Sequence, residues 1–334
     1  WLPDYEKLDL ILEGKKRRVN FTDDEMDFIR DYNNAENEAL VLIMKRLQAA
    51  CVDMGLTLNG WHGAGAIASA GLKKHKVKDL FYVGAIPNEL HKASKHAYFG
   101  GRIEIGKFGH HKGTVHHIDI NSAYPAAMVE LPNMSGGEWI HHPNGIDPRN
   151  SKNELILCRI NWNLYSEMAF APFPYRSKWQ RKVLFPHQGM NWVWKPELVA
   201  WLDNAYRWPE GASKVDILEC WEFVPSTDDK PFRFVNQYYN DRKAMVAESK
   251  RTGIPNGVEK AIKLFLNSIY GKFAQRIGYD EKTGRLPPYH NLFYAGYITS
   301  RTRARLWEAA VMDENNVICL ATDGVYTTTK LPID

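Results

Sequence analysis

Long hydrophobic stretches are missing from this 334-residue sequence, and no apolar run is long enough to cross a bilayer as a helix. Internal repeats and low-complexity tracts are missing as well. No segment has the GxxxxGKS/T pattern of a phosphate-binding loop. The sequence therefore gives no reason to expect a helical membrane protein, a repeat protein or a P-loop nucleotidase.

Cysteine is scarce, and its four copies show no spacing that is typical of a zinc site. We expect reduced thiols that pack in the interior, and hence a cytoplasmic protein. The four residues are Cys51, Cys158, Cys220 and Cys319.

Charge of one sign is not in large excess, because 43 Lys and Arg stand against 39 Asp and Glu, a formal net charge of +4. This balance argues only weakly for a polyanionic partner. Basic residues nevertheless cluster beside aromatic residues, as Arg301, Arg303 and Arg305 do beside Trp307. Such clusters are typical of surfaces that bind nucleic acid, although a solvated face is the simpler interpretation of any single cluster.

The length allows a large core and more than one domain, with 44% hydrophobic and 25% charged residues. Apolar residues at helical spacing predict an amphipathic helix over residues 23–50, and strands with glycine turns are predicted over 98–120. A segment dense in tryptophan, proline and short strand signals, residues 131–231, has the composition of an inserted subdomain. A helical hairpin is predicted over 232–250 and 258–274, because RTGIPNG interrupts two helical patterns.

Two aspartates each close a hydrophobic strand. Asp119 ends an apolar run in HIDINSAYP, and Asp323 lies in the Asp-Gly turn of a hairpin in NVICLATDGVYTT. Alone, each is explained as a strand end or a turn residue. Together they are what a pair of Mg²⁺ ions needs, since Mg²⁺ prefers oxygen ligands and two ions can clamp an in-line phosphoryl displacement. The pair therefore predicts a metal-dependent phosphoryl-transfer site.

A third pattern lies in KAIKLFLNSIYGKFAQ. Lys263, Asn267 and Tyr270 are four and three residues apart, which places them on one face of a helix, with apolar residues on the other. This row suits a triphosphate at the lysine end and a base or sugar near the tyrosine. A plain amphipathic helix with polar residues in water is the alternative, and the Tyr270-Gly271 pair argues mildly against it.

In order, the segments DINSAYP, KLFLNSIYG and ATDG resemble motifs A, B and C of family B DNA polymerases. Tyr98-Phe99-Gly100-Gly101 before the first motif is similar to the YxGG element of the protein-primed phage and plasmid branch. The segment ITSRTR, with Thr299 and Arg303, is similar to that branch's primer-template element. Tyr32 and Glu36 in DYNNAENEAL resemble the last exonuclease motif.

The resemblance implies a template-directed DNA polymerase that adds dNMP to a DNA 3′ end or to a hydroxyl of a priming protein. Its cofactor would be two Mg²⁺ ions, with Mn²⁺ as a substitute, on Asp119, Asp323 and the backbone carbonyl of Ile120. Lys263 would neutralise the departing pyrophosphate. Tyr124 would lie beneath the incoming sugar and select deoxynucleotides.

The remaining implied residues fall into two groups. Nucleotide contacts are implied for Asn267, Tyr270, Gly271, Arg242 and Lys243. Contacts with primer and template are implied for Tyr98, Gly100, Gly101, Thr299 and Arg303. The implied partners are a DNA primer-template, a dNTP and, in that branch, a terminal or priming protein, without a membrane.

The implied fold is α/β of the α+β kind, a palm with an antiparallel sheet that carries motifs A and C, helical-hairpin fingers and an inserted subdomain. The expected domains are the end of an exonuclease-like domain (1–50), linker and palm with motif A (51–132), an inserted subdomain like terminal-protein region 1 (133–231), fingers with motif B (232–274), and a short second insertion with motif C (275–334).

Two departures from the family pattern matter. Ala321 stands where motif C usually has its first aspartate, and Glu36 stands where the exonuclease motif usually has aspartate. The Ala321 departure keeps open a weakened or inactive polymerase-fold subunit that binds nucleic acid; a nuclease fragment is a third interpretation that leaves motif B unexplained. Because the chain begins at Trp1, we expect a fragment or processed product, without proofreading of its own.

Histidines occur in adjacent pairs. Side chains alternate along a strand, so the two members of a pair point to opposite faces and cannot hold one metal ion together. We expect surface or DNA-proximal histidines, with a zinc site built across pairs as the alternative. The pairs are His110-His111, His116-His117 and His141-His142.

Overall fold

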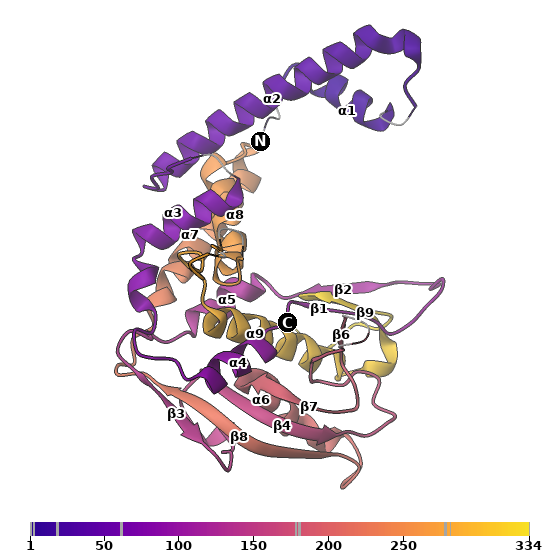
Figure 1. Ribbon diagram of the computed structural model, residues 1–334. Helices are drawn as coiled ribbons and strands as arrows, with labels where there is room; N and C mark the ends of the chain where they lie inside the picture. The colour runs from indigo at the N-terminus through magenta and orange to yellow at the C-terminus, as the bar shows by residue number, and fades with distance from the viewer. Residues whose placement is uncertain are drawn as a thin grey trace. The chain divides into compact units, whose positions relative to one another are not determined.

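The computed structural model describes residues 2, 4–17, 20–60, 63–177, 179, 182–276, 279–280 and 282–333. The chain forms two compact units. The first unit consists of Trp1–Lys74 and Tyr238–Phe265, and the second of His75–Gln237 and Leu266–Asp334. Figure 1 shows the elements of both. Within the described ranges, no helix is both long and apolar enough to cross a membrane.

The N-terminal part of the first unit is helical. A capping box between Thr22 and Glu25 precedes the long helix, which begins at Met26 and confirms the helix predicted there. Its Tyr32 is buried against the preceding helix, where a Cβ atom on Gly14 would come within 2.3 Å of the Tyr32 ring. The helices are α1 (Leu8–Arg17), the 3-10 helix η1 (Asp23–Glu25), α2 (Met26–Asp53) and α3 (Ala64–Lys74).

The predicted helical hairpin consists of α7 (Phe234–Thr252) and α8 (Gly257–Phe273), and it runs through both units. The Asn256 side chain begins α8, because its Oδ1 accepts hydrogen bonds from the N–H groups of Val258 and Glu259 at 2.8 and 3.2 Å. The polar insert RTGIPNG therefore separates the two helices, as the sequence predicted.

The first sheet of the second unit is antiparallel, in the order β1-β9-β10-β2. Its strands are β1 (Arg102–Ile105), β2 (His116–Asp119), β9 (Val317–Thr322) and β10 (Gly324–Thr327). This sheet joins the segments that contain motif A and motif C. The structure corrects one detail, since β2 is half-exposed rather than buried.

The second sheet lies in the segment predicted to be inserted, in the order β3-β8-β4-β7 (Figure 1). Its strands are β3 (Glu138–His142), β4 (Ile156–Asn163), β7 (Gln188–Trp194) and β8 (Lys214–Val224), with a separate small pair, β5 (Tyr175–Arg176) and β6 (Val183–Leu184). Its core is shared with the first sheet: Ile160 and Trp201 belong to one hydrophobic cluster with Trp307 and Leu320. The segment therefore packs as part of the second unit.

Helices complete the second unit. The N-terminus of α9 is capped by the preceding residue, Asn291, whose Oδ1 accepts hydrogen bonds from the N–H groups of Phe293 and Tyr294. The α-helices are α4 (Asn88–His96), α5 (Ala123–Val129), α6 (Lys195–Asn204) and α9 (Leu292–Ala310). The 3-10 helices are η2 (Val77–Leu80), η3 (Pro148–Asn150), η4 (Ala205–Arg207), η5 (Pro231–Arg233) and η6 (Glu314–Asn316). This mixture of helices and antiparallel sheets confirms the predicted α+β fold class.

Candidate functional site

The two aspartates meet at one end of the first sheet. Asp119 is the register partner of Gly324, the residue after Asp323. The N–H of Ile120 donates a hydrogen bond of 2.9 Å to the carbonyl of Asp323. The end of β2 and the turn before β10 are therefore fixed side by side by backbone pairing, whichever side chains they carry.

The turn that carries Asp323 is narrower than Thr322-Asp323-Gly324, the segment that separates the two arms of the hairpin in the sequence. Ala321 pairs directly with Gly324, so Thr322 and Asp323 are the two residues of the turn and Gly324 already belongs to β10. Thr322 takes the left-handed backbone conformation (φ 63°) that such a tight hairpin needs. Asp323 thus lies at the tip of the hairpin, as predicted.

The site concentrates negative charge. Burial raises the pKa of the Asp323 carboxyl, and the nearby charge of Asp119 raises it further. A divalent cation would relieve this repulsion, and two carboxylates suit Mg²⁺, which usually completes its octahedron with water and substrate phosphates. Across the described ranges, no group of three or more His, Cys, Asp or Glu side chains is arranged to hold a metal ion without such help.

Ala321 lies on the same face of the sheet as Asp119. Ala321 pairs with Gly324, which pairs with Asp119, and directly paired residues of antiparallel strands point to the same side. An aspartate at position 321 would add a carboxylate to the face that carries Asp119. With alanine there, this face has one negative charge fewer than the family pattern would give it.

Tyr124 and Tyr270 form a stacked pair next to the aspartates. Tyr124 lies in α5, just after Ser122, which has a left-handed φ of 50°. The centroid of its ring is 4.2 Å from that of Tyr270 at an interplanar angle of 29°. Burial raises the pKa of Tyr124, and the nearby Tyr270 and Asp323 add to this shift. Motifs A, B and C thus contribute neighbouring side chains in the second unit.

The segment Tyr98–Gly101 packs against this pair. A Cβ atom on Gly101 would lie 2.8 Å from Cγ2 of Thr322 and 3.2 Å from the hydroxyl of Tyr124, so a glycine is needed there. Burial, followed by the field of Tyr270, raises the pKa of Tyr98 to about 12. The segment is therefore part of the same constellation.

The buried side chain of Arg303 binds the backbone of the Tyr98–Gly101 segment. Its Nη1 donates hydrogen bonds to the carbonyls of Phe99 and Gly100, at 2.8 and 2.7 Å. Its Nε donates to Oε1 of Glu197 at 2.8 Å, and both side chains are only 1% exposed. The Thr299 hydroxyl is 0% exposed and donates to carbonyls of its own helix, including that of Ala295 at 3.1 Å.

These contacts change the interpretation of two predicted DNA-binding residues. Neither Thr299 nor Arg303 presents its side chain to solvent in this structure, so the support that either could give to DNA is indirect, through the Tyr98–Gly101 segment. Within the basic cluster that contains Arg303, Trp307 is also buried, at 1% exposed, whereas Arg305 is exposed. Sequence reasoning missed Glu197, which has no sequence signal beyond an acidic residue in the first turn of a helix.

Helix α8 has the two faces that the sequence predicted. Lys263 and Asn267 are exposed and Tyr270 is half-buried. The residues on the opposite face are buried, namely Ile262, Phe265, Leu266, Ile269 and Phe273. Gly271 is open, since nothing lies within 4 Å of the position a Cβ atom would take.

A basic hollow of about 390 Å³ lies in the first unit between α7 and α8. Its basic lining residues are Arg242, Lys250, Lys260 and Lys263. Glu259 also lines it and is 5% exposed; its Oε1 accepts a hydrogen bond of 2.9 Å from Nε of Arg242. Lys243 is exposed on α7. The hollow carries an excess of positive charge, which suits a phosphate chain.

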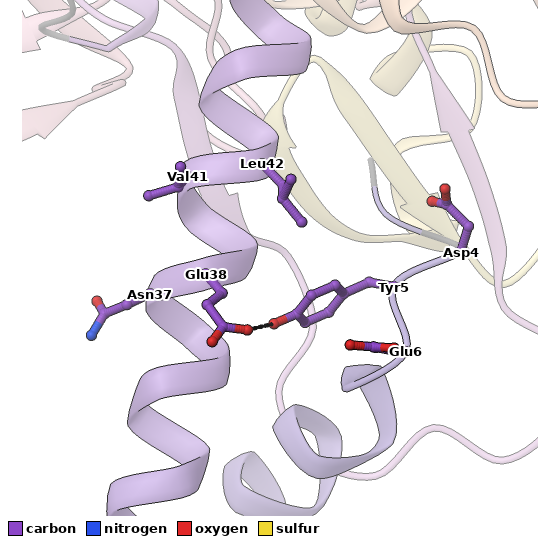
Figure 2. Close-up of a pocket in the computed structure, with 7 residues that line it drawn as sticks. All are labelled: Asp4, Tyr5, Glu6, Asn37, Glu38, Val41 and Leu42. Atoms are coloured by element: carbon purple, nitrogen blue, oxygen red, sulfur yellow. Dashed lines mark hydrogen bonds between the residues drawn. The ribbon is translucent and has the colours of Figure 1, made fainter.

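A second hollow of the first unit, about 660 Å³, is acidic (Figure 2). Its lining residues are Asp4, Tyr5, Glu6, Asn37, Glu38, Val41 and Leu42. Figure 2 shows Tyr5 pointing at Glu38, to which its hydroxyl donates a hydrogen bond of 2.9 Å. Asp4 is ion-paired with Arg46 at 2.8 Å. The acidic lining repels phosphates, so this hollow is a poor candidate for a nucleotide.

Comparisons of the sequence place it near known polymerases. The model of the family described as DNA polymerase type B, organellar and viral, matches residues 64–284. A DNA polymerase of Acidianus bottle-shaped virus (isolate Italy/Pozzuoli) is 26% identical over 251 residues, which cover 73% of this chain and 34% of that protein. A probable DNA polymerase of Agaricus bitorquis is 25% identical over 195 residues, 57% of this chain and 22% of that protein. The chain thus spans about a third and about a fifth of these relatives.

Solved structures of Phi29 DNA polymerase are similar in fold. The orthorhombic crystal form gives a TM-score of 0.59 at 19% identity and covers 94% of this chain and 55% of that one. The ternary complex with primer-template DNA and incoming nucleotide substrates gives 0.55 at 18% identity, with 95% and 55% covered. At these identities the likeness concerns the fold.

Proposed function

The chain belongs to the family DNA polymerase type B, organellar and viral, as its three motifs predicted, and we propose on this basis that it forms the palm and fingers of a template-directed DNA polymerase. The reaction would add dNMP to a DNA 3′ end or to a hydroxyl of a priming protein. The observation that supports this most is the junction of Asp119 and Asp323, fixed by the 2.9 Å hydrogen bond from Ile120 to Asp323.

In this proposal, the primer hydroxyl forms a new bond with the α-phosphorus of the dNTP while the bond to pyrophosphate breaks. Asp119, Asp323 and the carbonyl of Ile120 would hold Mg²⁺, with Mn²⁺ as a substitute. The metal would neutralise charge on the attacking and leaving oxygens. The raised pKa of Asp323 supports this assignment, because burial and then the charge of Asp119 both disfavour its charged form, and a divalent cation would offset both effects.

The incoming nucleotide would lie against the stacked tyrosines. Tyr124 would oppose a 2′-hydroxyl, and Tyr270 with Asn267 and Gly271 would shape the space for the base pair. The openness around Gly271 supports this, since a pocket for a base needs room.

Contacts with the triphosphate are proposed for cations of the helical hairpin. Lys263 is exposed and lines the basic hollow, as Arg242 does. Arg242 shares its charge with Glu259, so we propose Lys263 as the main catalytic cation and Arg242 as a secondary contact. Lys243, which is exposed on α7, would act only through its longer-range charge.

Template and primer would run along the Tyr98–Gly101 segment. Tyr98, Gly100 and Gly101 would touch DNA directly, whereas Thr299 and Arg303 would act by holding that segment. We also keep the predicted domain division, with residues 133–231 as the segment that would meet a priming protein. Residues of that segment and of α9 belong to one hydrophobic cluster, so a priming protein bound to the segment would contact a part that packs directly on the proposed palm.

The test is primer extension with Mg²⁺ by the full-length protein, comparing the wild type with Asp323→Asn. We expect incorporation to fall by at least about a hundredfold, because the variant lacks a carboxylate that would hold the metal ions against the negative charge of the transition state. Gel filtration and thermal unfolding serve as controls for folding. Equal rates in the two proteins would end the assignment of Asp323.

Ala321 favours a second candidate, a nucleic-acid-binding subunit with weak or no catalysis. It removes one carboxylate from the face of the sheet that carries Asp119. Titration with Mn²⁺ in the presence of primer-template and dNTP separates the two proposals. DNA binding without metal-dependent nucleotide binding would favour the second.

A further inference from the structure

His117 shares a face of the first sheet with Asp119. The two residues are two positions apart on β2, so their side chains point to the same side. His117 is paired across the sheet with Tyr326, and the two rings stack with centroids 4.3 Å apart at 14°. The Tyr326 ring covers one face of the imidazole, and the edge of the imidazole, which includes Nε2, can make a further contact.

The backbone of Gly324 makes room for that edge. A Cβ atom at Gly324 would lie 2.7 Å from Nε2 of His117 and 3.6 Å from Oδ1 of Asp119. The imidazole edge and the carboxylate therefore flank the same point of β10. Any other residue at this position would push the imidazole away, so the Asp323-Gly324 pair serves His117 as well as the hairpin.

The same face of the sheet is exposed along its two edge strands, β1 and β2, and is partly apolar. The row of His117 continues through Tyr326 and Cys319 to Ile105, and the row of Asp119 continues through Gly324 and Ala321 to Ile103. Ile103 and Ile105 are 76% and 55% exposed. A polar edge beside an apolar floor suits the sugar-phosphate of a nucleic-acid strand, whose deoxyribose rings tolerate apolar neighbours.

The face that carries His117 adjoins the proposed metal site. His117 and Asp119 are two residues apart on β2 and point to the same side of the sheet. The proposed function, on which this inference rests, assigns the incoming sugar to Tyr124 in α5. The attacking 3′ end must also reach Asp119, and the exposed face of the sheet beside Asp119 is a surface that can hold it.

We propose that His117, held by Tyr326, contacts the 3′-terminal nucleotide of the primer through Nε2. This contact fixes the last sugar-phosphate of the primer beside Asp119. His117 is therefore a residue that positions the primer, and it is distinct from the residues that hold the incoming nucleotide.

The experiment compares His117→Ala, His117→Asn and the matched control His116→Ala in the full-length protein. His116 is the neighbouring histidine on the opposite face of the same strand. We expect His117→Ala to raise the KM for primer-template about tenfold, the size of one lost polar contact at a nucleic acid, and to leave the KM for dNTP unchanged. His117→Asn should restore part of the loss, and His116→Ala should behave as wild type.

Equilibrium binding adds a readout without turnover. His117→Ala should weaken binding of a primer-template junction and leave binding of the single-stranded template unchanged. An unchanged primer-template KM, or a loss that appears instead in the Mg²⁺ requirement or the KM for dNTP, would overturn the assignment. If Asp323→Asn abolishes incorporation while His117→Ala has no effect, only the His117 proposal fails; if Asp323→Asn has no effect, the proposed function itself fails.

Discussion

Two regions of this chain, the Asp119–Asp323 pair and the basic hollow between α7 and α8, depend on different kinds of contact. Asp119 and Asp323 are placed by backbone register and by the 2.9 Å hydrogen bond between Ile120 and Asp323. The hollow between α7 and α8 is closed by side chains, through the 2.9 Å contact of Arg242 with Glu259. Backbone pairing remains when a side chain is replaced, whereas an ion pair is lost. Substitution of an aspartate in the first region should therefore lower activity and leave the free energy of unfolding almost unchanged. Substitution in the ion pair of the second region should change both nucleotide binding and the free energy of unfolding.

The sharpest way to test this contrast is Asp119→Asn. Asp119 is exposed, and the backbone hydrogen bond beside it does not involve its carboxylate. We expect nucleotide incorporation to fall at least about a hundredfold, since a preorganised charge is lost. The free energy of unfolding should change by less than about 0.5 kcal/mol, as for other exposed residues. Primer extension and urea denaturation measure the two effects; a large loss of stability would contradict a register-based site.

Gly101→Val should displace the Tyr98–Gly101 segment from the hairpin that carries Asp323. A Cβ atom at this position would meet Cγ2 of Thr322 at 2.8 Å and the backbone Cα of Thr322 at 3.3 Å. Relief of this clash requires the Tyr98–Gly101 segment to move off the hairpin, at a cost of about 1–3 kcal/mol in unfolding free energy. We expect activity to fall by about two- to tenfold, because Asp323 lies in the same turn and the barrier rises by about 0.5–1.5 kcal/mol if half of that strain reaches the site.

A matched variant for the stability measurement is Gly100→Ala. Nothing lies within 4 Å of the Cβ position of Gly100, so its unfolding free energy should stay within about 0.5 kcal/mol of wild type. Similar losses of stability in Gly101→Val and Gly100→Ala would show that the backbone approach at Gly101 is not what fixes the turn.

Features that depend on contacts between residues close together in the sequence could be predicted, and features that depend on distant residues could not. The two faces of α8 and the hairpin around Asp323 depend on residues a few positions apart, and a periodic pattern or a turn signal reveals them. The sequence placed the hairpin turn within Thr322-Asp323-Gly324, but the Asp-Gly signal does not distinguish which two of these residues occupy the central positions. The distinction depends on the pairing of Ala321 with Gly324, which only the sheet determines.

The burial of Arg303 could not be predicted in this way. Its partner Glu197 is 106 residues away in the sequence, and the carbonyls of Phe99 and Gly100 that it holds are 204 and 203 residues away. No local pattern distinguishes an arginine that will bind DNA from one that will bury an ion pair. The clustering of Arg303 with other basic residues predicted an exposed side chain. The packing of α9 against α6 instead buries Arg303 in an ion pair with Glu197.

Glu259→Gln is the mildest of the three changes and addresses the hollow that side chains hold together. Glutamine keeps an acceptor for Arg242 but removes the only carboxylate among the described lining residues of a hollow that also contains Lys250, Lys260 and Lys263. We expect the unfolding free energy to fall by about 1 kcal/mol, because a partly buried ion pair becomes a neutral hydrogen bond.

The same change should favour the nucleotide. Removal of a negative charge from the proposed triphosphate site should lower the KM for dNTP about two- to fivefold at low salt, and the gain should shrink as added salt screens the charges. Glu248→Gln is the control, because Glu248 lies on α7 and pairs with Arg251 outside the lining of the hollow. A higher KM for dNTP in Glu259→Gln would show that Glu259 acts by orienting Arg242 toward the triphosphate and that the ion pair, rather than the net charge of the hollow, determines binding.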